Sequence, residues 1–228
     1  MQKMIILTGA GMSAESGIKT FRDDGGLWEG YDIVEVATNQ GFRDNPELVL
    51  TFYNERRRAL KEVEPNQGHI NLKTLEQYFE VHIITQNVDD LHERAGSSRV
   101  LHLHGELRKV RSILDPNLVY PWDGDLVLGD TCEQGSQLRP HIVWFGEAVP
   151  MIDKAARLVE KADILVIIGT SMQVYPAAGL IGYTKPQTPI YFIDPKPNFN
   201  PDYHENPTTI IEDTAVGGTE KLLKMLVD

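Results

Sequence analysis

The chain has almost no cysteine, a deficit of basic residues and no long apolar run. Cys132 is the only cysteine among 228 residues, so no disulfide can form within the chain and we expect a reducing compartment. No apolar run approaches the roughly 18 residues that a membrane-spanning helix needs. Lysine and arginine number 22 against 33 acidic residues, and the net charge of −11 argues against direct nucleic-acid binding. We therefore expect a cytoplasmic protein, monomeric, that contacts neither membranes nor nucleic acid.

Short apolar runs recur along the chain, with helical patterns between several of them. This alternation predicts an α/β fold, Rossmann-like, with a mostly parallel sheet and helices on both faces. The predicted strands are Met4–Leu7, Val81–Ile84, Val100–Leu103, Ile142–Phe145, Ile164–Ile168 and Ile190–Ile193. The clearest helix start is Asn45 followed by Pro46, since Asn caps helices and Pro suits the first helical position. The predicted helices run from Pro46 to about Val63, from Asn66 to Tyr78, from Pro150 to Lys161 and from Thr219 to Val227.

One stretch, residues 111–139, lacks clear periodicity and is rich in proline and glycine. We interpret it as a small irregular lobe inserted in the main domain. Packing must hold this lobe, and its apolar residues are the candidates for a small core: Leu114, Leu118, Val119, Tyr120, Trp122, Leu126 and Leu128.

The segment from Gly9 to Arg22 directly follows the first predicted strand. Glycine has no Cβ, so closely spaced glycines let a backbone approach a pyrophosphate, and Ser13 and Ser16 add hydroxyl donors. The position three after Gly11 is Ala14, which fits only a relaxed dinucleotide-binding fingerprint. The glycines alone are also compatible with a tight strand-to-helix turn that binds nothing.

Two further motifs lie at predicted strand ends, where open α/β sheets bind ligands. Gln86, Asn87 and Asp89 could hydrogen-bond a ribose and an amide, although Asn and Asp also favour turns and helix caps. Strand alternation places His102 and His104 on one face. An imidazole with a pKa near ~6.5 can accept a hydroxyl proton at neutral pH, although a lone histidine is more often structural.

These motifs together resemble the sirtuins, the NAD-dependent protein-lysine deacylases. The resemblance runs from residue 4 to about 225 and includes the segments 9–22, 85–89, 104–105, 139–147 and 169–171 in family order. It implies one catalytic domain over residues 1–228. Its large Rossmann-like part covers about 1–40, 80–108 and 140–228, a helical part covers 41–79, and the small lobe covers 109–139.

The resemblance also implies NAD as the cofactor, and nicotinamide, O-acyl-ADP-ribose and free lysine as products. His104 corresponds to the general base, with Asn87 and Asp89 as catalytic partners at the nicotinamide end, and His102 is expected to support the structure. Residues 24–28 are expected to form a flap that orders on NAD binding. The implied cofactor-binding residues are Gly9, Ala10, Gly11, Ser13, Glu15, Thr20, Phe21, Arg22, Trp28, Gln86, Asn87, Asp89, Gly169, Thr170, Ser171, Asp194 and Ala215. The implied peptide and acyl-lysine contacts are Val143, Trp144, Phe145 and Gly146.

The chain departs from the family pattern at two places. Sirtuins typically hold a structural zinc in the small lobe with two Cys-x-x-Cys pairs, whereas this chain has only Cys132, so we predict no metal. Asp194 stands where most sirtuins have Asn. A carboxylate there would repel a 2′-phosphate, which favours NAD over NADP.

Tyr53 and Arg56 are three residues apart on a predicted helix and hence on one face of it. This Tyr-x-x-Arg resembles the class III sirtuins, in which the pair binds the distal carboxylate of a succinyl or malonyl group. Because Arg57 and Arg58 follow, a solvated basic stretch is the other interpretation. We predict removal of succinyl, malonyl and some acetyl groups from acyl-lysine proteins or peptides.

Two other functions remain open at this stage. The same scaffold can serve a mono-ADP-ribosyltransferase, in which a protein nucleophile captures the ribose. It can also serve as an NAD-binding module without chemistry, although the joint presence of Asn87, Asp89 and His104 argues against that. A dehydrogenase would need a substrate domain of its own.

Overall fold

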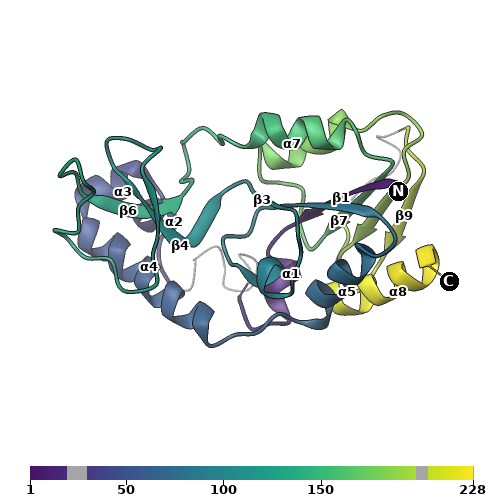
Figure 1. Ribbon diagram of the computed structural model, residues 1–228, viewed down its shortest axis with the longest axis horizontal. Helices are drawn as coiled ribbons and strands as arrows, with labels where there is room; N and C mark the ends of the chain where they lie inside the picture. The colour runs from purple at the N-terminus through teal and green to yellow at the C-terminus, as the bar shows by residue number, and fades with distance from the viewer. Residues whose placement is uncertain (20–29, 199–204, 228) are drawn as a thin grey trace.

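A six-stranded parallel sheet forms the centre of the computed structural model, which describes residues 1–19, 30–198 and 205–227 (Figure 1). Every neighbouring pair of strands is parallel, as predicted. From β1 the chain builds outward through β2 and β3, and later returns to the other side of β1 with β7. The strand order is β3 (Val100–His102), β2 (Glu80–Thr85), β1 (Lys3–Thr8), β7 (Ile164–Ile168), β8 (Ile190–Ile193) and β9 (Thr208–Ile211).

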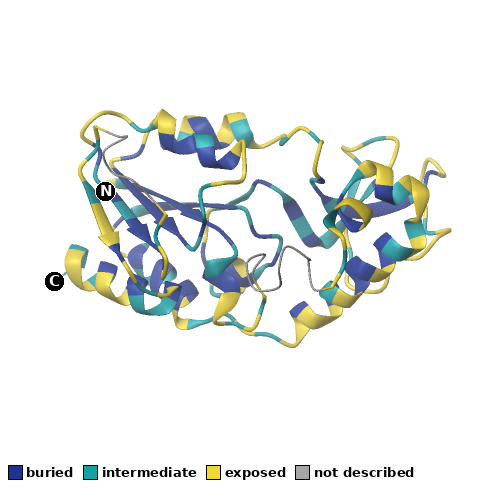
Figure 2. Ribbon diagram, turned by 180° about the vertical axis from the view of Figure 1, so that it is seen from behind, coloured by how far each residue is buried: buried dark blue, intermediate teal, exposed yellow. Residues whose placement is uncertain are grey.

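Helices cover both faces of this sheet because its strands are apolar on both sides. In β1, Met4 and Ile6 pack into one hydrophobic cluster, and Ile5 and Leu7 pack into the other. Figure 2 shows the central strands buried between the two helical layers. The first cluster includes residues of α1 (Gly11–Ala14), α5 (Gln67–Leu75) and α8 (Ala215–Val227). The second includes residues of α7 (Ile152–Val159) and the 3₁₀ helix η1 (Ala177–Tyr183).

The predicted helix starts are confirmed where a local cap defines them. Asn45 Oδ1 accepts a hydrogen bond from Leu48 N at 3.1 Å at the start of α4 (Pro46–Lys61). Asn66 caps α5 in the same way, although that helix ends at Leu75 and not at Tyr78. Among the described residues, no helix has the length and apolar character to cross a membrane.

The small lobe consists mostly of loops and turns over residues 111–139, as predicted, but it also contributes to a three-stranded antiparallel sheet that was not predicted. Its central strand, β4, has only two large apolar residues, Leu107 and Val110, among charged neighbours, so the sequence gives little strand signal. The predicted strand over residues 142–145 is also wrong. The strand β6 ends at Ile142, and Phe145 makes only an isolated bridge with Thr38. This sheet has the order β5 (Val119–Pro121), β4 (Gly105–Ser112) and β6 (Leu138–Ile142).

A separate hydrophobic cluster holds this lobe against α4. Leu50 of α4 contributes to the cluster, and so does the buried thiol of Cys132. Two predicted core residues are instead on the surface, since Leu114 is 78% and Leu128 46% exposed. The buried members are Leu50, Val110, Leu126, Cys132 and Leu138. Three short helices complete the fold: α2 (Ile33–Val36), α3 (Asn39–Asp44) and α6 (Leu91–Arg94).

Candidate active site

The carboxyl ends of β1 and β7 meet where the strand order reverses, which is the usual ligand crevice of a doubly wound sheet. The turns after these two strands are in direct backbone contact. Gly9 N donates to Ile168 O at 3.0 Å, and Gly11 N donates to Gly169 O at 2.9 Å. Two segments that the sequence marked separately therefore form one structure.

This contact explains why glycine is required at these positions, apart from the predicted approach of a pyrophosphate. A Cβ on Gly11 would lie 2.7 Å from the Cα of Gly169, and a Cβ on Gly9 would lie 2.7 Å from the Cβ of Thr170. Gly169 also has φ +60°, a conformation that favours glycine. The turns can pack at this distance only without side chains.

Three predicted site residues form a buried hydrogen-bonded group in this crevice. Ser13 Oγ donates to Asp89 Oδ2 at 2.8 Å and accepts from Asn87 Nδ2 at 3.1 Å. The other oxygen of Asp89 accepts from Leu91 N. Burial raises the pKa of Asp89 above its usual value, although the Ser13 hydroxyl opposes the shift. The turn after β1 and the turn after β2 are thus joined by side chains.

A second contact joins the turns after β2 and β7. Gln86 Nε2 donates to Thr170 Oγ1 at 3.1 Å, and Thr170 Oγ1 also accepts from Met172 N. Ser171, the last residue of this predicted motif, is half-buried beside them. Amide, hydroxyl and carboxylate groups therefore gather from three segments, and such groups can bind a ribose and a carboxamide.

His104 is held in one tautomer by the main chain. Its Nδ1 lies 3.0 Å from Gln86 O. A carbonyl only accepts, so Nδ1 carries the proton and Nε2 is left with a lone pair. Burial lowers the pKa of His104, although its bond to Gln86 opposes this. The imidazole is therefore neutral at neutral pH and can accept a proton at Nε2.

His102 lies two residues away and has the opposite chemistry. Its Nε2 is 2.8 Å from Glu93 Oε1 and its Nδ1 is 3.1 Å from Asn87 O, so both nitrogens have acceptor partners. Burial lowers the pKa of His102, but Glu93 outweighs it and the net shift is upward. A histidine engaged on both sides suits the expected supporting role.

Two more of the predicted cofactor-binding residues, Glu15 and Asp194, have protein partners in this structure. Glu15 caps α8, accepting from Val216 N at 2.8 Å and from Thr214 Oγ1 at 3.1 Å. This contact explains why α8 begins at Ala215 and not at Thr219, a cap that local sequence does not reveal. Asp194 is buried, and its Oδ1 accepts from Lys196 N.

The contacts of these residues with the cofactor remain predictions. Ala10 precedes α1 beside the same crevice. Four predicted cofactor residues and the predicted flap over 24–28 lie outside the described residues: Thr20, Phe21, Arg22 and Trp28.

The predicted substrate segment begins beside the candidate base. Val143 N donates to His104 O at 2.9 Å, and Gly146 has φ +85°. Phe145 is 52% exposed. Trp144 is only 2% exposed and packs in a hydrophobic cluster with Phe52 and Tyr53 of α4. Its indole Nε1 donates to the Tyr53 hydroxyl at 2.9 Å, a contact that the sequence analysis missed.

Tyr53 and Arg56 differ in exposure. Tyr53 is fully buried, whereas Arg56 is half-buried, with its guanidinium carbon 3.3 Å from the centre of the Phe52 ring. Burial raises the pKa of Tyr53, and the charge of Arg56 acts on it in the opposite direction. Tyr53 is thus a neutral phenol close to a cation.

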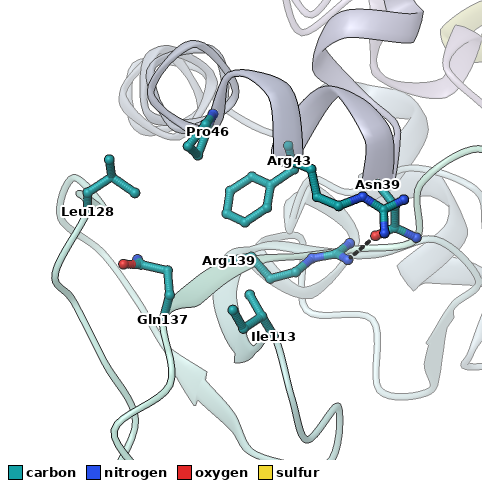
Figure 3. Close-up of a pocket in the computed structure, with 8 residues that line it drawn as sticks. Asn39, Arg43, Pro46, Ile113, Leu128, Gln137 and Arg139 are labelled. Carbon is teal, nitrogen blue, oxygen red and sulfur yellow. Dashed lines mark hydrogen bonds between the residues drawn. The ribbon is translucent and has the colours of Figure 1, made fainter.

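A separate pocket of about 400 Å³ lies between α3, the start of α4 and the small lobe (Figure 3). Arg139 lies at one end, where its Nη1 donates to Asn39 Oδ1 at 3.1 Å. Among the described residues, none of the predicted cofactor-binding ones lines this pocket. Its lining residues are Asn39, Phe42, Arg43, Pro46, Ile113, Leu128, Gln137 and Arg139.

Comparison with known proteins gives consistent matches over nearly the whole chain. Residues 9–176 match the sequence model of the Sir2 family. A Helicobacter pylori protein named NAD-dependent protein deacylase is 58% identical, covering 100% of this chain and 99% of its own length. A Bacteroides thetaiotaomicron protein of the same name is 54% identical, covering 100% and 99%. A solved Sir2 homologue–NAD complex has a TM-score of 0.86 at 39% identity, covering 98% of this chain and 88% of that one.

Proposed function

Because this chain belongs to the Sir2 family, we propose that it is an NAD-dependent protein deacylase that prefers succinyl- and malonyl-lysine over acetyl-lysine. The deacylase name of full-length relatives supports the reaction. The observation that supports the reaction in this chain is the neutral imidazole of His104, whose Nε2 is able to accept a proton. Its Nδ1 is bonded to the carbonyl of Gln86, which directly precedes Asn87 of the group formed by Ser13, Asn87 and Asp89.

The residues in the crevice fit NAD by their chemistry. Ser13, Asn87 and Asp89 offer a hydroxyl, an amide and a carboxylate on one side, and Gln86 and Thr170 offer an amide and a hydroxyl on the other. Bound there, NAD would supply an electrophilic ribose carbon for the acyl oxygen of the substrate, and nicotinamide as the leaving group. The buried partners fix these side chains in advance, so little reorganisation accompanies binding.

In this proposal His104 Nε2 receives a hydroxyl proton during acyl transfer. Its Nδ1 proton stays on Gln86 O, which keeps the ring oriented. The lowered pKa of His104 keeps Nε2 unprotonated at neutral pH, with burial as the main cause. The bond from Val143 N to His104 O ties the predicted peptide segment to the base.

The acyl preference rests on Arg56. A carboxylate at the end of a succinyl or malonyl chain can pair with its guanidinium, and a charge-assisted hydrogen bond contributes roughly 1.5–3 kcal/mol. An acetyl group has no such carboxylate. Stacking on Phe52 and a bond from Arg56 Nη1 to Phe52 O at 2.9 Å hold the guanidinium in place.

The test uses matched peptides that carry acetyl-, malonyl- or succinyl-lysine, incubated with and without NAD and analysed by mass spectrometry. We expect NAD-dependent loss of succinyl and malonyl to exceed loss of acetyl. Arg56→Met should lower kcat/KM on the succinyl peptide by about 10- to 100-fold. Arg58→Met is the matched control, because Arg58 lies on the same helix and pairs with Asp125 on the surface.

Two outcomes would contradict parts of the proposal. Acetyl removal alone would keep the deacylase and reject the role of Arg56. Transfer of labelled ADP-ribose onto protein without any deacylation would reject the deacylase.

A further inference from the structure

The guanidinium of Arg139 is buried between a carboxylate and an aromatic ring. Only 5% of Arg139 is exposed. Its Nη1 donates to Glu147 Oε1 at 2.8 Å and its Nη2 to Glu147 Oε2 at 3.1 Å, a bidentate pair. Its carbon Cζ lies 3.3 Å from the centre of the Trp144 ring. This cation therefore holds one face of the indole.

Glu147 also holds the main chain of the same tryptophan. Its Oε2 accepts from Trp144 N at 2.8 Å and from Arg111 Nη2 at 3.1 Å. The indole of Trp144 is thus fixed through its backbone by Glu147 and through its ring by Arg139, and both contacts depend on one carboxylate. Rigid placement follows, since neither a backbone shift nor a ring rotation leaves these contacts intact.

The only polar group of this indole, its Nε1–H, is hydrogen-bonded to Tyr53. Indole Nε1 donates only, so the Tyr53 oxygen is the acceptor of the 2.9 Å bond. The hydroxyl proton of Tyr53 must therefore point away from Trp144. The Tyr53 ring is further fixed by an edge contact with Phe52, with ring centres 4.9 Å apart.

We propose that Glu147 and Arg139 are positioning residues that act through Trp144 to orient the Tyr53 hydroxyl for a carboxylate-bearing acyl group. The proposal rests on the acyl preference put forward above. A hydrogen bond to a carboxylate depends steeply on direction, whereas an acetyl group offers no carboxylate for this hydroxyl. The network therefore affects the selectivity between acyl groups more than it affects the shared chemistry of deacylation.

A double-mutant cycle tests this inference. Trp144→Phe keeps a ring for Arg139 and removes the N–H, and Tyr53→Phe removes the acceptor. We expect Trp144→Phe to lower the ratio of kcat/KM for succinyl over acetyl peptides by about fivefold, chiefly through KM, which corresponds to one neutral hydrogen bond. In the Tyr53→Phe background the same change should have no further effect on the ratio.

Trp122→Phe is the matched control. Trp122 lies at the edge of the small-lobe cluster, and its Nε1 has no hydrogen-bond partner among the described residues. Loss of the Trp122 N–H should leave the ratio of kcat/KM for succinyl over acetyl peptides unchanged. Arg139→Lys provides a second variant if Trp144→Phe fails to fold, because it keeps a charge near Glu147 and loses the planar stack. It should lower the same ratio.

The outcomes separate this inference from the proposed function. A wild-type enzyme that does not favour succinyl or malonyl peptides rejects the acyl preference and this inference with it. A wild-type enzyme that does favour them, combined with a Trp144→Phe effect that is equal for both acyl groups or additive with Tyr53→Phe, rejects the positioning role alone.

Discussion

The central sheet and the small lobe are held together by different kinds of interaction. In the sheet, the four residues Met4–Leu7 of β1 are at most 3% exposed and pack into two clusters of apolar side chains. The lobe side of the molecule buries two arginines instead, since Arg57 is 1% and Arg139 is 5% exposed. The first region is stabilised by apolar area, and the second also by directed hydrogen bonds.

Arg57 shows how such a bond network replaces apolar packing. Its Nε donates to Leu107 O at 2.9 Å, and its Nη1 donates to Asn54 Oδ1 at 2.8 Å and to Gly124 O at 3.2 Å. Burial lowers the pKa of Arg57 to about 10, but the group stays charged at neutral pH. One side chain therefore joins α4 to β4 and to a loop of the lobe.

The stability of the small lobe therefore depends on particular hydrogen-bond and ion-pair partners, whereas that of the central sheet depends on the apolar area that it buries. An apolar core tolerates a change of shape better than a buried charge tolerates the loss of its partner. The variants below test this difference, beginning with the largest expected effect.

Among these variants, we expect the largest loss in the free energy of unfolding when the buried carboxylate of Glu147 is removed. Glu147→Gln leaves Arg139 and Arg111 without their carboxylate, so we expect a loss of about 3–5 kcal/mol in the free energy of unfolding. Urea denaturation measures it. Asp125→Asn is the control, because its pair with Arg58 is exposed and should contribute less than about 1 kcal/mol. Equal losses in both variants would contradict the distinction between buried and exposed pairs.

Acid should destabilise the protein through a histidine pair beneath the cofactor crevice. His69 and His92 are fully buried, with ring centres 4.9 Å apart, and His92 Nε2 lies 3.0 Å from Thr8 Oγ1. Burial lowers the pKa of His69 to about 4, and burial also lowers that of His92. The unfolded chain binds protons first, so stability is complete above pH 6.5 and falls as the pH drops towards 4.

For His69 alone this loss amounts to ~3 kcal/mol. The measurement is the free energy of unfolding between pH 4 and 7 for wild type and His69→Gln, with His82→Gln as the control outside the pair. An unchanged pH slope in His69→Gln would contradict the assignment.

A side chain at Gly169 should disrupt the close packing between the turn after β1 and the turn after β7. Gly169→Ala would place a Cβ 2.6 Å from Met12 N, so we expect a loss of about 2 kcal/mol or more and weaker NAD binding. Gly135→Ala has a similar φ of +76° but nothing within 4 Å, so it measures the conformational cost alone, about 1 kcal/mol. Calorimetry with NAD and thermal unfolding compare the two. Equal effects would show that the close packing of the turns is not needed.

The smallest effect is expected at the single cysteine. Cys132 is buried in the lobe cluster with its sulfur 3.2 Å from Ser136 Oγ. Cys132→Ser should cost about 1 kcal/mol, because it places a hydroxyl among the apolar side chains of the cluster and a bond to Ser136 Oγ offsets only part of that cost. We also expect a chelator to leave the unfolding midpoint and the turnover of the wild type unchanged. A marked loss on chelation would reveal a metal that holds the lobe.

Five of the six strands of the central sheet were predicted because they are apolar runs with helical patterns between several of them. The edge strand β9 was missed, since two of its four residues are threonines and only Ile211 is buried. The sheet of the lobe was missed for a physical reason: β4 has charged residues at half of its positions, and its partner β6 lies more than 25 residues further along the chain. The site shows the same division. The members of the Ser13, Asn87 and Asp89 group were identified from the sequence, but their mutual bonds and the bond from Trp144 to Tyr53 depend on tertiary packing.

The most direct test of the account compares wild type with His104→Asn on a succinyl-lysine peptide, with NAD binding measured on both. Free lysine peptide and released nicotinamide are followed by mass spectrometry. We predict NAD-dependent deacylation by the wild type and a loss of about 10²–10⁴-fold in the turnover of the variant, with NAD still bound. Undiminished turnover by His104→Asn would contradict the assignment of the base, and no turnover by the wild type on any acyl peptide would contradict the deacylase itself.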